Sequence, residues 1–529
     1  MRILFFLTLA GLALVQCTPK EPTYVNQLVE TGFDLTESMA PFYHGVASGD
    51  PQQTSVLLWT RVTPPFHQPV TVSWKLAEDA RFSKVIASGS VKTDRTKDYT
   101  VKVIPEGLTP GTRYYYQFEA FGKSSITGRT NTFPEGDVDA FTLAFASCSN
   151  YQFGPFNAYN RIADNDTINA VLHLGDYIYE YEAGRYGDST TTRFHIPDTE
   201  LTTLQDYRER YAQYRLDEGL RRAHQQHPFI NIWDDHELSN NAYDMGAQNH
   251  QPETEGTWDA KKAAAVQAYF EWLPVRDEYK PTLYRSFSIG NLADLMMLEG
   301  RLQRTQQADS VSEPSFGSTD RTMLGEQQKN WLKTELSNSK ATWRIMGNQV
   351  MFSDLNVAHV NRGKPKFLDM WAGYPVEQQE LVRFFEEDDI DNILIFTGDF
   401  HSSLSSEVTH SALNPSVYSP ENGNYAMASE FVVHSVNAAN YNEYIGDEGA
   451  REIDTRYKNP EYNPNVVYAN TRDHGYVLLK LTDEEAIVEY RYVHTTKTWN
   501  PDEKPKTILR VPADTAKIEV VQLEGVQQK

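Results

Sequence analysis

Cysteine and basic residues are both scarce in this sequence. Only Cys17 and Cys148 occur in 529 residues, and 49 lysines and arginines face 72 aspartates and glutamates, a formal net charge of −23. A protein that binds nucleic acid must neutralise phosphates with a basic face, so we expect no nucleic-acid-binding face here. A solvated acidic surface is the common meaning of such a charge balance, and cation binding is a second one.

The start of the chain contains an apolar run, Ile3 to Val15, but this run is not long enough to span a membrane. This run is too short to span as a helix and has the length of a signal-peptide core, so residues 1–17 are predicted to direct export. Cys17 directly follows and resembles the lipidated cysteine of bacterial lipoproteins, although Gln16 stands where a small residue is usual. We expect a periplasmic or cell-surface lipoprotein anchored through Cys17, or otherwise a secreted protein.

Export leaves Cys148 without a partner in an oxidising compartment, where a free thiol is a liability. It ends the apolar stretch FTLAFASCSN and lies between two serines. Three interpretations are open: a small buried hydrophobe, a nucleophile, or a thiolate that binds a metal.

The pattern of apolar residues divides the chain into two kinds of structure. Residues 18–40 are predicted to be a linker, and residues 41–135 contain short alternating strands with turn residues between them. Regular strands of this type favour a small β-sandwich of the fibronectin or immunoglobulin class. Residues 136–495 alternate continuous apolar strands with amphipathic helices, which predicts an α/β catalytic domain, and residues 496–529 are predicted to be a tail.

Potential ligand side chains follow the apolar strands of the second part. Ligands gather outside the carboxyl ends of strands in open α/β sheets, so we expect these side chains to converge. A single Gly-Asp turn or a buried core histidine has an ordinary structural explanation, but four such strand ends are hard to attribute to turns. The residues are Cys148, Asp176, Tyr179, Asp235, His236, Asn240, Asp399 and His401.

The side-chain types in this set point to highly charged cations. Carboxylates and an asparagine oxygen suit calcium, magnesium or manganese, and imidazole suits transition metals. Holding the Cys148 thiol and the Tyr179 phenol ionised beside Asp176 requires a strongly polarising ion such as ferric iron. Zinc is the alternative, because thiolate, imidazole and carboxylate also bind it.

The segments FASCSN, HLGDYIYEY, WDDHELSNN and FTGDFHSS resemble those of the PhoD-like alkaline phosphatase family, a variant of the calcineurin-like metallophosphoesterases. FYHGVASGDPQQTSVLLWTRV and GLTPGTRYYYQF are similar to the small domain that precedes the catalytic domain in that family. The resemblance implies a four-layer αββα core and a centre of one Fe³⁺ with Ca²⁺. It assigns Cys148, Asp176 and Tyr179 to iron, with Asp176 bridging towards calcium. It makes Asn240, Asp399 and His401 further metal ligands. Asp235 and His236 lie in the Asp-Asp-His-Glu motif of the segment WDDHELSNN.

The same resemblance matches Arg301 and Arg304 to positions of a family segment. The sequence also departs from the family pattern at four positions. Glu299 and Gly300 stand where the family has Asp and Thr, and Ala372 replaces an Asp in the segment LDMWAGY. His434 occupies a position where a small residue is commoner, either as a substitute ligand or donor or as an ordinary loop histidine. These departures predict an altered second-metal site.

We expect a monomeric, exported, metal-dependent phosphoesterase that hydrolyses phosphomonoesters, in small molecules or polymers. Metal-activated water would attack phosphorus, His236 would protonate the leaving group, and Arg301 would pair with the phosphate. Three alternatives are open: phosphodiesterase or phospholipase-type activity at the same centre, a non-catalytic surface lipoprotein that binds a ligand, and a hydrolase with Cys148 as nucleophile and His236 as base.

Overall fold

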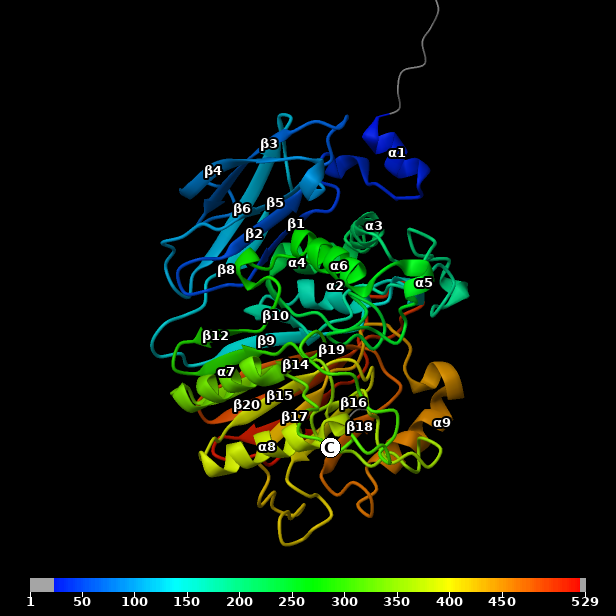
Figure 1. Ribbon diagram of the computed structural model, residues 1–529. Helices are drawn as coiled ribbons and strands as arrows, with labels where there is room; N and C mark the ends of the chain where they lie inside the picture. The colour runs from blue at the N-terminus through cyan, green and yellow to red at the C-terminus, as the bar shows by residue number, and fades with distance from the viewer. Residues whose placement is uncertain (1–22, 524–529) are drawn as a thin grey trace, which may run out of the picture.

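The computed structural model describes residues 23–523, whose strands form three sheets (Figure 1). The export segment and the lipidation predicted at Cys17 lie outside the described residues. Within residues 23–523, no helix is both long enough and apolar enough to cross a membrane.

The largest sheet has ten strands and carries part of the predicted site. Its parallel strands β9, β10 and β11 are buried along their whole length or nearly so, as their continuous apolar runs predict. In spatial order the strands are β22 (Glu519–Gln522), β21 (Thr507–Pro512), β20 (Glu485–Tyr492), β19 (Gly475–Leu481), β9 (Phe141–Ala146), β10 (Ala170–His173), β11 (Pro228–Asn231), β1 (Val46–Gly49), β2 (Leu57–Arg61) and β5 (Thr100–Val103).

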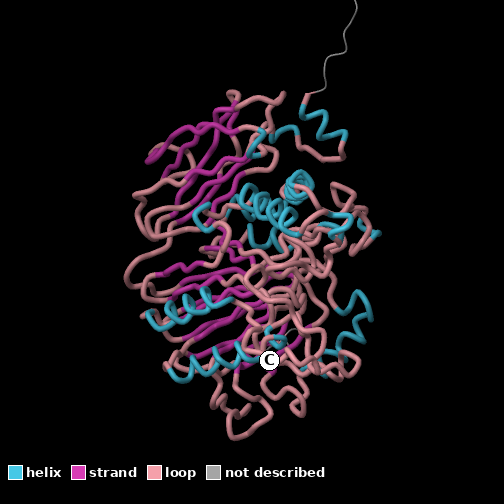
Figure 2. Tube along the Cα trace, viewed as in Figure 1, coloured by secondary structure: helices cyan, strands magenta, loops and turns pink. Residues whose placement is uncertain are grey.

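A second sheet of seven strands packs against the first. The rings of Phe145 on β9 and Phe396 on β15 stack with centroids 3.8 Å apart, which joins the two sheets in one core. Figure 2 shows loops gathered beside the stacked strands, on the side that faces α5 and α9. The strands, in spatial order, are β12 (Arg285–Ile289), β13 (Ala293–Met297), β14 (Trp343–Asn348), β15 (Ile393–Thr397), β17 (Ala428–Val432), β16 (Ser403–Val408) and β18 (Val466–Asn470).

Helices cover both sheets. Buried residues of α2, α3, α4 and α6 share a core with the ten-stranded sheet, and those of α7 and α8 share a second core with the seven-stranded sheet. The segments after Thr257 and Leu324 form α6 and α7, within the part of the chain where amphipathic helices are predicted. The helices are α1 (Tyr24–Glu30), α2 (Asn157–Ala163), α3 (Leu204–Tyr214), α4 (Glu218–Gln226), α5 (Pro252–Glu255), α6 (Trp258–Trp272), α7 (Gly325–Asn338), α8 (Pro375–Glu387) and α9 (Tyr441–Tyr457).

The N-terminal strands are divided between two sheets. A five-stranded sheet packs over β1, β2 and β5 through a shared apolar core, while β1 itself pairs in parallel with β11 of the catalytic region. Likewise, the segment predicted to be a tail contains β21 and β22, which extend the ten-stranded sheet. The five-stranded sheet consists of β4 (Val85–Thr93), β3 (Val70–Ala77), β6 (Arg113–Ala120), β7 (Lys123–Ser124) and β8 (Gly128–Asn131).

Candidate metal centre

The predicted ligands follow the carboxyl ends of strands from both large sheets. Cys148 follows β9, Asp176 follows β10, and Asp399 and His401 follow β15. All four have left-handed backbone conformations, with φ of 58°, 55°, 60° and 61°. Non-glycine residues rarely adopt this region, and such strain persists where the surrounding structure fixes it, often at functional sites.

One group of side chains combines a thiol, a phenol, a carboxylate and an imidazole. Ligand atoms of Cys148, Asp176 and His401 all lie within 4.8 Å of one another. The Tyr179 hydroxyl donates to Asp176 Oδ2 at 2.9 Å and lies 3.3 Å from His401 Nε2. Burial raises the pKa of Cys148 and of Tyr179 well above their ordinary values, and the Asp176 charge raises both further. A strongly charged cation would offset this cost of ionisation, so this donor set fits ferric iron.

A second group beside it contains carboxylates alone. Ligand atoms of Asp234, Asp235 and Asp399 lie within 4.8 Å of one another. Asp234 Oδ2 and Asp235 Oδ1 are buried without a hydrogen-bond partner among the described residues. Burial raises the pKa of Asp399 to about 7 and that of Asp234 well above its ordinary value. Unpartnered carboxylate oxygens in this arrangement fit a hard cation such as calcium.

Arg301, which follows β13, carries the positive charge that faces the carboxylates of Asp234, Asp235 and Asp399. Its Nε donates to Asp234, its Nη2 to Asp399 at 2.8 Å, and its Nη1 to Asp369 at 2.7 Å. The guanidinium is fully buried, and Nη2 also lies 3.6 Å from Asp235. Every nitrogen of the guanidinium is therefore already committed to carboxylates.

Asp369 is a functional candidate that the sequence interpretation missed. Its carboxylate accepts hydrogen bonds from both Arg301 and Arg304, the latter at 2.6 Å. It lies three positions before Ala372, which is buried in a short 3-10 helix, Trp371–Gly373. The sequence signal was an acidic residue in the same segment, LDMWAGY, three positions before the carboxylate that is missing at 372.

His236 is held by an acidic residue that the sequence interpretation also left out. Its Nδ1 lies 2.6 Å from Glu180 Oε2, and its ring centroid lies 4.3 Å from that of Tyr179. Burial alone would lower the pKa of His236, but the charges of Asp235 and Glu180 outweigh it and raise the pKa well above its ordinary value. The surrounding carboxylates therefore favour the protonated form of the His236 imidazole. The sequence signal for this contact was Glu180 itself, an acidic residue in the segment HLGDYIYEY.

The structure places Asn240 at the border of the centre. Its backbone N–H donates to Glu180 at 2.8 Å, and its side-chain amide donates to Gln248 at 3.1 Å. The next residue, Asn241, donates its N–H to Asp235 at 2.6 Å. The structure thus brings Cys148, Asp176, Tyr179, Asp235, His236, Arg301, Asp399 and His401 together and leaves Asn240 beside them.

Two departures from the family pattern have structural roles. Glu299 Oε1 accepts hydrogen bonds from Trp233 Nε1 at 2.8 Å and from the Arg301 and Leu302 N–H groups, so this side chain shapes the loop that carries Arg301. At Gly300 an added Cβ would meet Gln349 Oε1 at 3.0 Å, so the loop leaves little room for a larger residue.

His434 lies apart from the metal-ligand groups in a buried hydrogen-bond network. Its Nδ1 lies 3.1 Å from Ser403 Oγ, and its Nε2 lies 3.1 Å from the Arg491 carbonyl oxygen. Burial lowers the pKa of His434 to about 3. It is therefore a neutral structural histidine and does not act as the substitute ligand that the sequence suggested.

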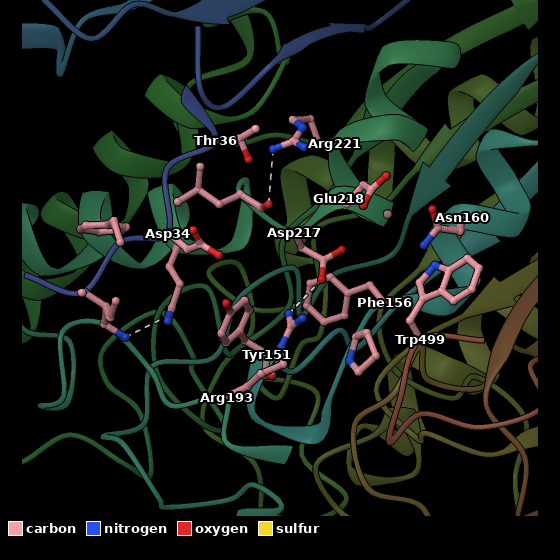
Figure 3. Close-up of a pocket in the computed structure, with 17 residues that line it drawn as sticks. Asp34, Thr36, Tyr151, Phe156, Asn160, Arg193, Asp217, Glu218, Arg221 and Trp499 are labelled. Carbon is pink, nitrogen blue, oxygen red and sulfur yellow. Dashed lines mark hydrogen bonds and ion pairs between the residues drawn. The ribbon is translucent and has the colours of Figure 1, made fainter. Parts of the chain in front are cut away.

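A cavity of about 360 Å³ is lined in part by residues of the segment that follows Cys148 (Figure 3). Tyr151, Phe156 and Trp499 line it, and Arg193 crosses it in an ion pair with Asp217 at 2.9 Å. None of the predicted site residues lines this cavity. The metal-ligand groups are thus separate from it.

Comparison with known proteins shows the family of this chain. Residues 143–490 match the PhoD-like phosphatase family, and residues 29–134 match the PhoD-like phosphatase N-terminal domain. The chain belongs to the PhoD-like phosphatase family. Alkaline phosphatase D of Bacillus subtilis (strain 168) is 35% identical to it over 476 residues, which cover 86% of this chain and 78% of the relative.

The fold of this PhoD-like phosphatase is similar to that of a solved relative. A structure of PhoD superposes with a TM-score of 0.82 at 31% identity, and the match covers 93% of this chain and 94% of the other. The predicted family and the predicted enzyme class are both confirmed. The protein is a phosphatase, that is, a phosphoric ester hydrolase.

Proposed function

We propose that this phosphatase hydrolyses phosphomonoesters at a centre that binds one Fe³⁺ together with Ca²⁺. The observation that carries the proposal is the pairing of two adjacent groups: thiol, phenol, carboxylate and imidazole in one, and carboxylates alone in the other. We also propose that the two facing sheets and their helices form the four-layer αββα core of the metallophosphoesterases.

The proposed ligands divide between the two groups. Cys148, Asp176, Tyr179 and His401 would hold iron, with Asp176 shared between the metals. Asp235 and Asp399 would hold calcium, together with Asp234, while Asn240 borders that group. Zinc is the alternative metal, and the tyrosine argues against it because phenolate is an unusual zinc ligand.

The chemistry of the reaction assigns roles to two further residues. When bound, the cations supply positive charge to the phosphoryl oxygens and lower the pKa of the attacking water. His236, fixed by Glu180, donates a proton to the alkoxide oxygen as the bond from phosphorus to the alcohol breaks. Arg301, whose nitrogens donate to Asp234, Asp369 and Asp399, would place its positive charge beside the phosphate without a free guanidinium nitrogen to pair with it.

A phosphodiesterase or phospholipase-type activity is the alternative, because the same ligands would serve it. The relative rates on nitrophenyl phosphate and bis-nitrophenyl phosphate separate the two. A preference for the diester would overturn the monoester proposal. A hydrolase that uses Cys148 as nucleophile predicts inactivation by thiol alkylation in metal-loaded protein, whereas a metal-held thiolate predicts protection.

Export and anchoring are proposed from the N-terminal sequence alone. The apolar run before Cys17 supports export, and lipidation of Cys17 would attach a monomeric enzyme to a membrane. Membrane fractions of cells that produce the wild type and Cys17→Ser test the anchor. Equal membrane association of the two would contradict it.

The deciding experiment is elemental analysis of protein that begins at Thr18. One iron per chain accompanied by calcium supports the proposed centre. Two zincs per chain would keep the phosphatase but overturn the ligand roles, and folded protein that binds no metal would overturn the metal-dependent mechanism.

A further inference from the structure

The segment 438–440, which leads into the first turn of α9 and includes its N-cap, contacts the candidate iron group. The Ala438 N–H donates to the Cys148 carbonyl oxygen at 3.2 Å, and the Ala439 carbonyl oxygen lies 2.8 Å from His401 Nδ1. Ser402 Oγ donates to Asn440 Oδ1, the helix cap, at 2.6 Å. This turn is therefore positioned directly beside two of the proposed iron ligands.

The same turn exposes two large apolar side chains. Tyr444 is 68% exposed and Ile445 is 49% exposed, although the residues from 428 to 440 that lead into the helix are buried. Gly446, with φ 74° and ψ 166°, interrupts the helix directly after them. The interruption separates this turn from the rest of α9, whose buried residues all lie at Ala450 or beyond.

A row of tyrosines connects Tyr444 with the candidate iron group. Partial burial raises the pKa of Tyr444, whose side chain lies next to that of Tyr186. The Tyr186 hydroxyl lies 3.3 Å from His401 Nδ1, and its ring centroid lies 5.7 Å from that of Tyr179. Tyr444 thus lies beside Tyr186 while 68% of the residue stays open to solvent.

We propose that Tyr444 and Ile445 form an apolar platform that receives the alcohol portion of the substrate. The phosphoryl group would lie at the metal ligands, and the alcohol portion would extend along Tyr186 to the ring of Tyr444. Such a platform favours phosphate esters of aromatic or other apolar alcohols over esters of small polar alcohols. This inference rests on the proposed phosphatase reaction and names the substrate class for the same site.

The test compares nitrophenyl phosphate with glycerol phosphate in the metal-loaded, full-length mature protein. In Tyr444→Ala the KM for nitrophenyl phosphate should rise about five- to tenfold while kcat changes by less than about twofold, because the platform binds ground state and transition state equally. The ratio of kcat/KM for nitrophenyl phosphate to that for glycerol phosphate should fall by about the same factor. Ile445→Ala should change the ratio in the same direction.

Two variants isolate the role of the ring. Tyr444→Phe keeps the apolar face and loses only the hydroxyl, so it should retain the wild-type ratio. Phe66→Ala removes an exposed aromatic ring from the loop between β2 and β3, and it should leave both substrates unaffected.

The failures of the two proposals are distinguishable. If wild-type protein with iron and calcium hydrolyses neither ester, the proposed function fails and the platform fails with it. If the wild type hydrolyses both but Tyr444→Ala leaves the ratio unchanged, only the platform is overturned. A loss in Tyr444→Phe equal to that in Tyr444→Ala would also overturn it, because Tyr444 would then act through Tyr186 alone.

Discussion

The Tyr179 hydroxyl donates a hydrogen bond to Asp176 Oδ2 across 2.9 Å, in a position that is closed to solvent. The phenol belongs to the segment that follows β10, and His401, which follows β15 in the other large sheet, lies 3.3 Å from the same hydroxyl. This single contact therefore joins the strand ends of both sheets at the proposed iron position.

Replacement of that phenol should remove iron. We expect Tyr179→Phe to lose most of its iron and to lower kcat/KM by about a hundredfold or more, because a phenolate ligand stabilises the ferric state and the reaction depends on the metal. Elemental analysis and visible absorption from phenolate-to-iron charge transfer measure the effect. Tyr177→Phe is the matched control, because Tyr177 is also buried but its hydroxyl lies 2.8 Å from His224 Nε2, outside the metal-ligand groups. Full iron content in Tyr179→Phe would contradict the assignment.

Removal of the buried counter-charge should destabilise chelator-treated protein. In Arg301→Gln the surrounding carboxylates lose their cation, so the free energy of unfolding should fall by about 3–5 kcal/mol. Urea denaturation in the presence of a chelator measures the loss, and added calcium should restore more stability to this variant than to the wild type. Arg301→Lys keeps the charge and should lose less. Unchanged stability in Arg301→Gln would show that the carboxylates do not depend on Arg301.

The buried imidazole of His434 should make the fold sensitive to acid. Its folded pKa of about 3 lies below the unfolded value of about 6.5, so between these pH values the unfolded chain binds the extra proton. The stability contribution is complete above pH ~6.5 and declines by up to about 1.4 kcal/mol per pH unit as the pH falls towards ~3. His434→Gln should be less stable at pH 8 but should show a shallower decline in acid. Urea midpoints at several pH values provide the measurement, and parallel declines would refute the prediction.

The stacked pair Phe145 and Phe396 should be a major contributor to the contact between the sheets. Phe396→Ala should lower the free energy of unfolding by about 3–5 kcal/mol, because a cavity would remain where the rings stack. Phe66→Ala, at an exposed position, should change it by less than about 0.5 kcal/mol. Thermal or urea unfolding of both variants checks the contrast. A small effect at Phe396 would mean that the sheets separate or repack easily.

Much of the centre could be predicted from the sequence because its ligands follow strands. The apolar runs before Cys148, Asp176 and Asp399 mark buried strands, and the carboxyl ends of parallel strands meet at one edge of a sheet. Convergence of Cys148 with Asp176 therefore follows from local pattern and a general rule of α/β folds, whereas Asp399 follows β15 of the other sheet and meets them only through the packing of the two sheets.

The remaining features depend on contacts between distant segments. Asp369 lies in a loop, and only the tertiary structure places its carboxylate within 2.7 Å of Arg301. The neutral state of His434 depends on burial by Tyr490 and Tyr492, whose positions no local pattern around residue 434 encodes. The division of the N-terminal strands between two sheets could not be predicted from the sequence either, because alternation identifies a strand but not the sheet that it joins.

The parallel pairing of β1 with β11 has a consequence for any attempt to shorten the enzyme. A chain that began after Phe133 would lack β1, β2 and β5, so the buried strand Pro228–Asn231 would become the border of its sheet. Such a border presents free N–H and C=O groups to other molecules and invites aggregation. The catalytic half is therefore not a detachable module: its solubility depends on β1, β2 and β5, which precede it in the sequence, and insertions or deletions between the two halves are constrained accordingly.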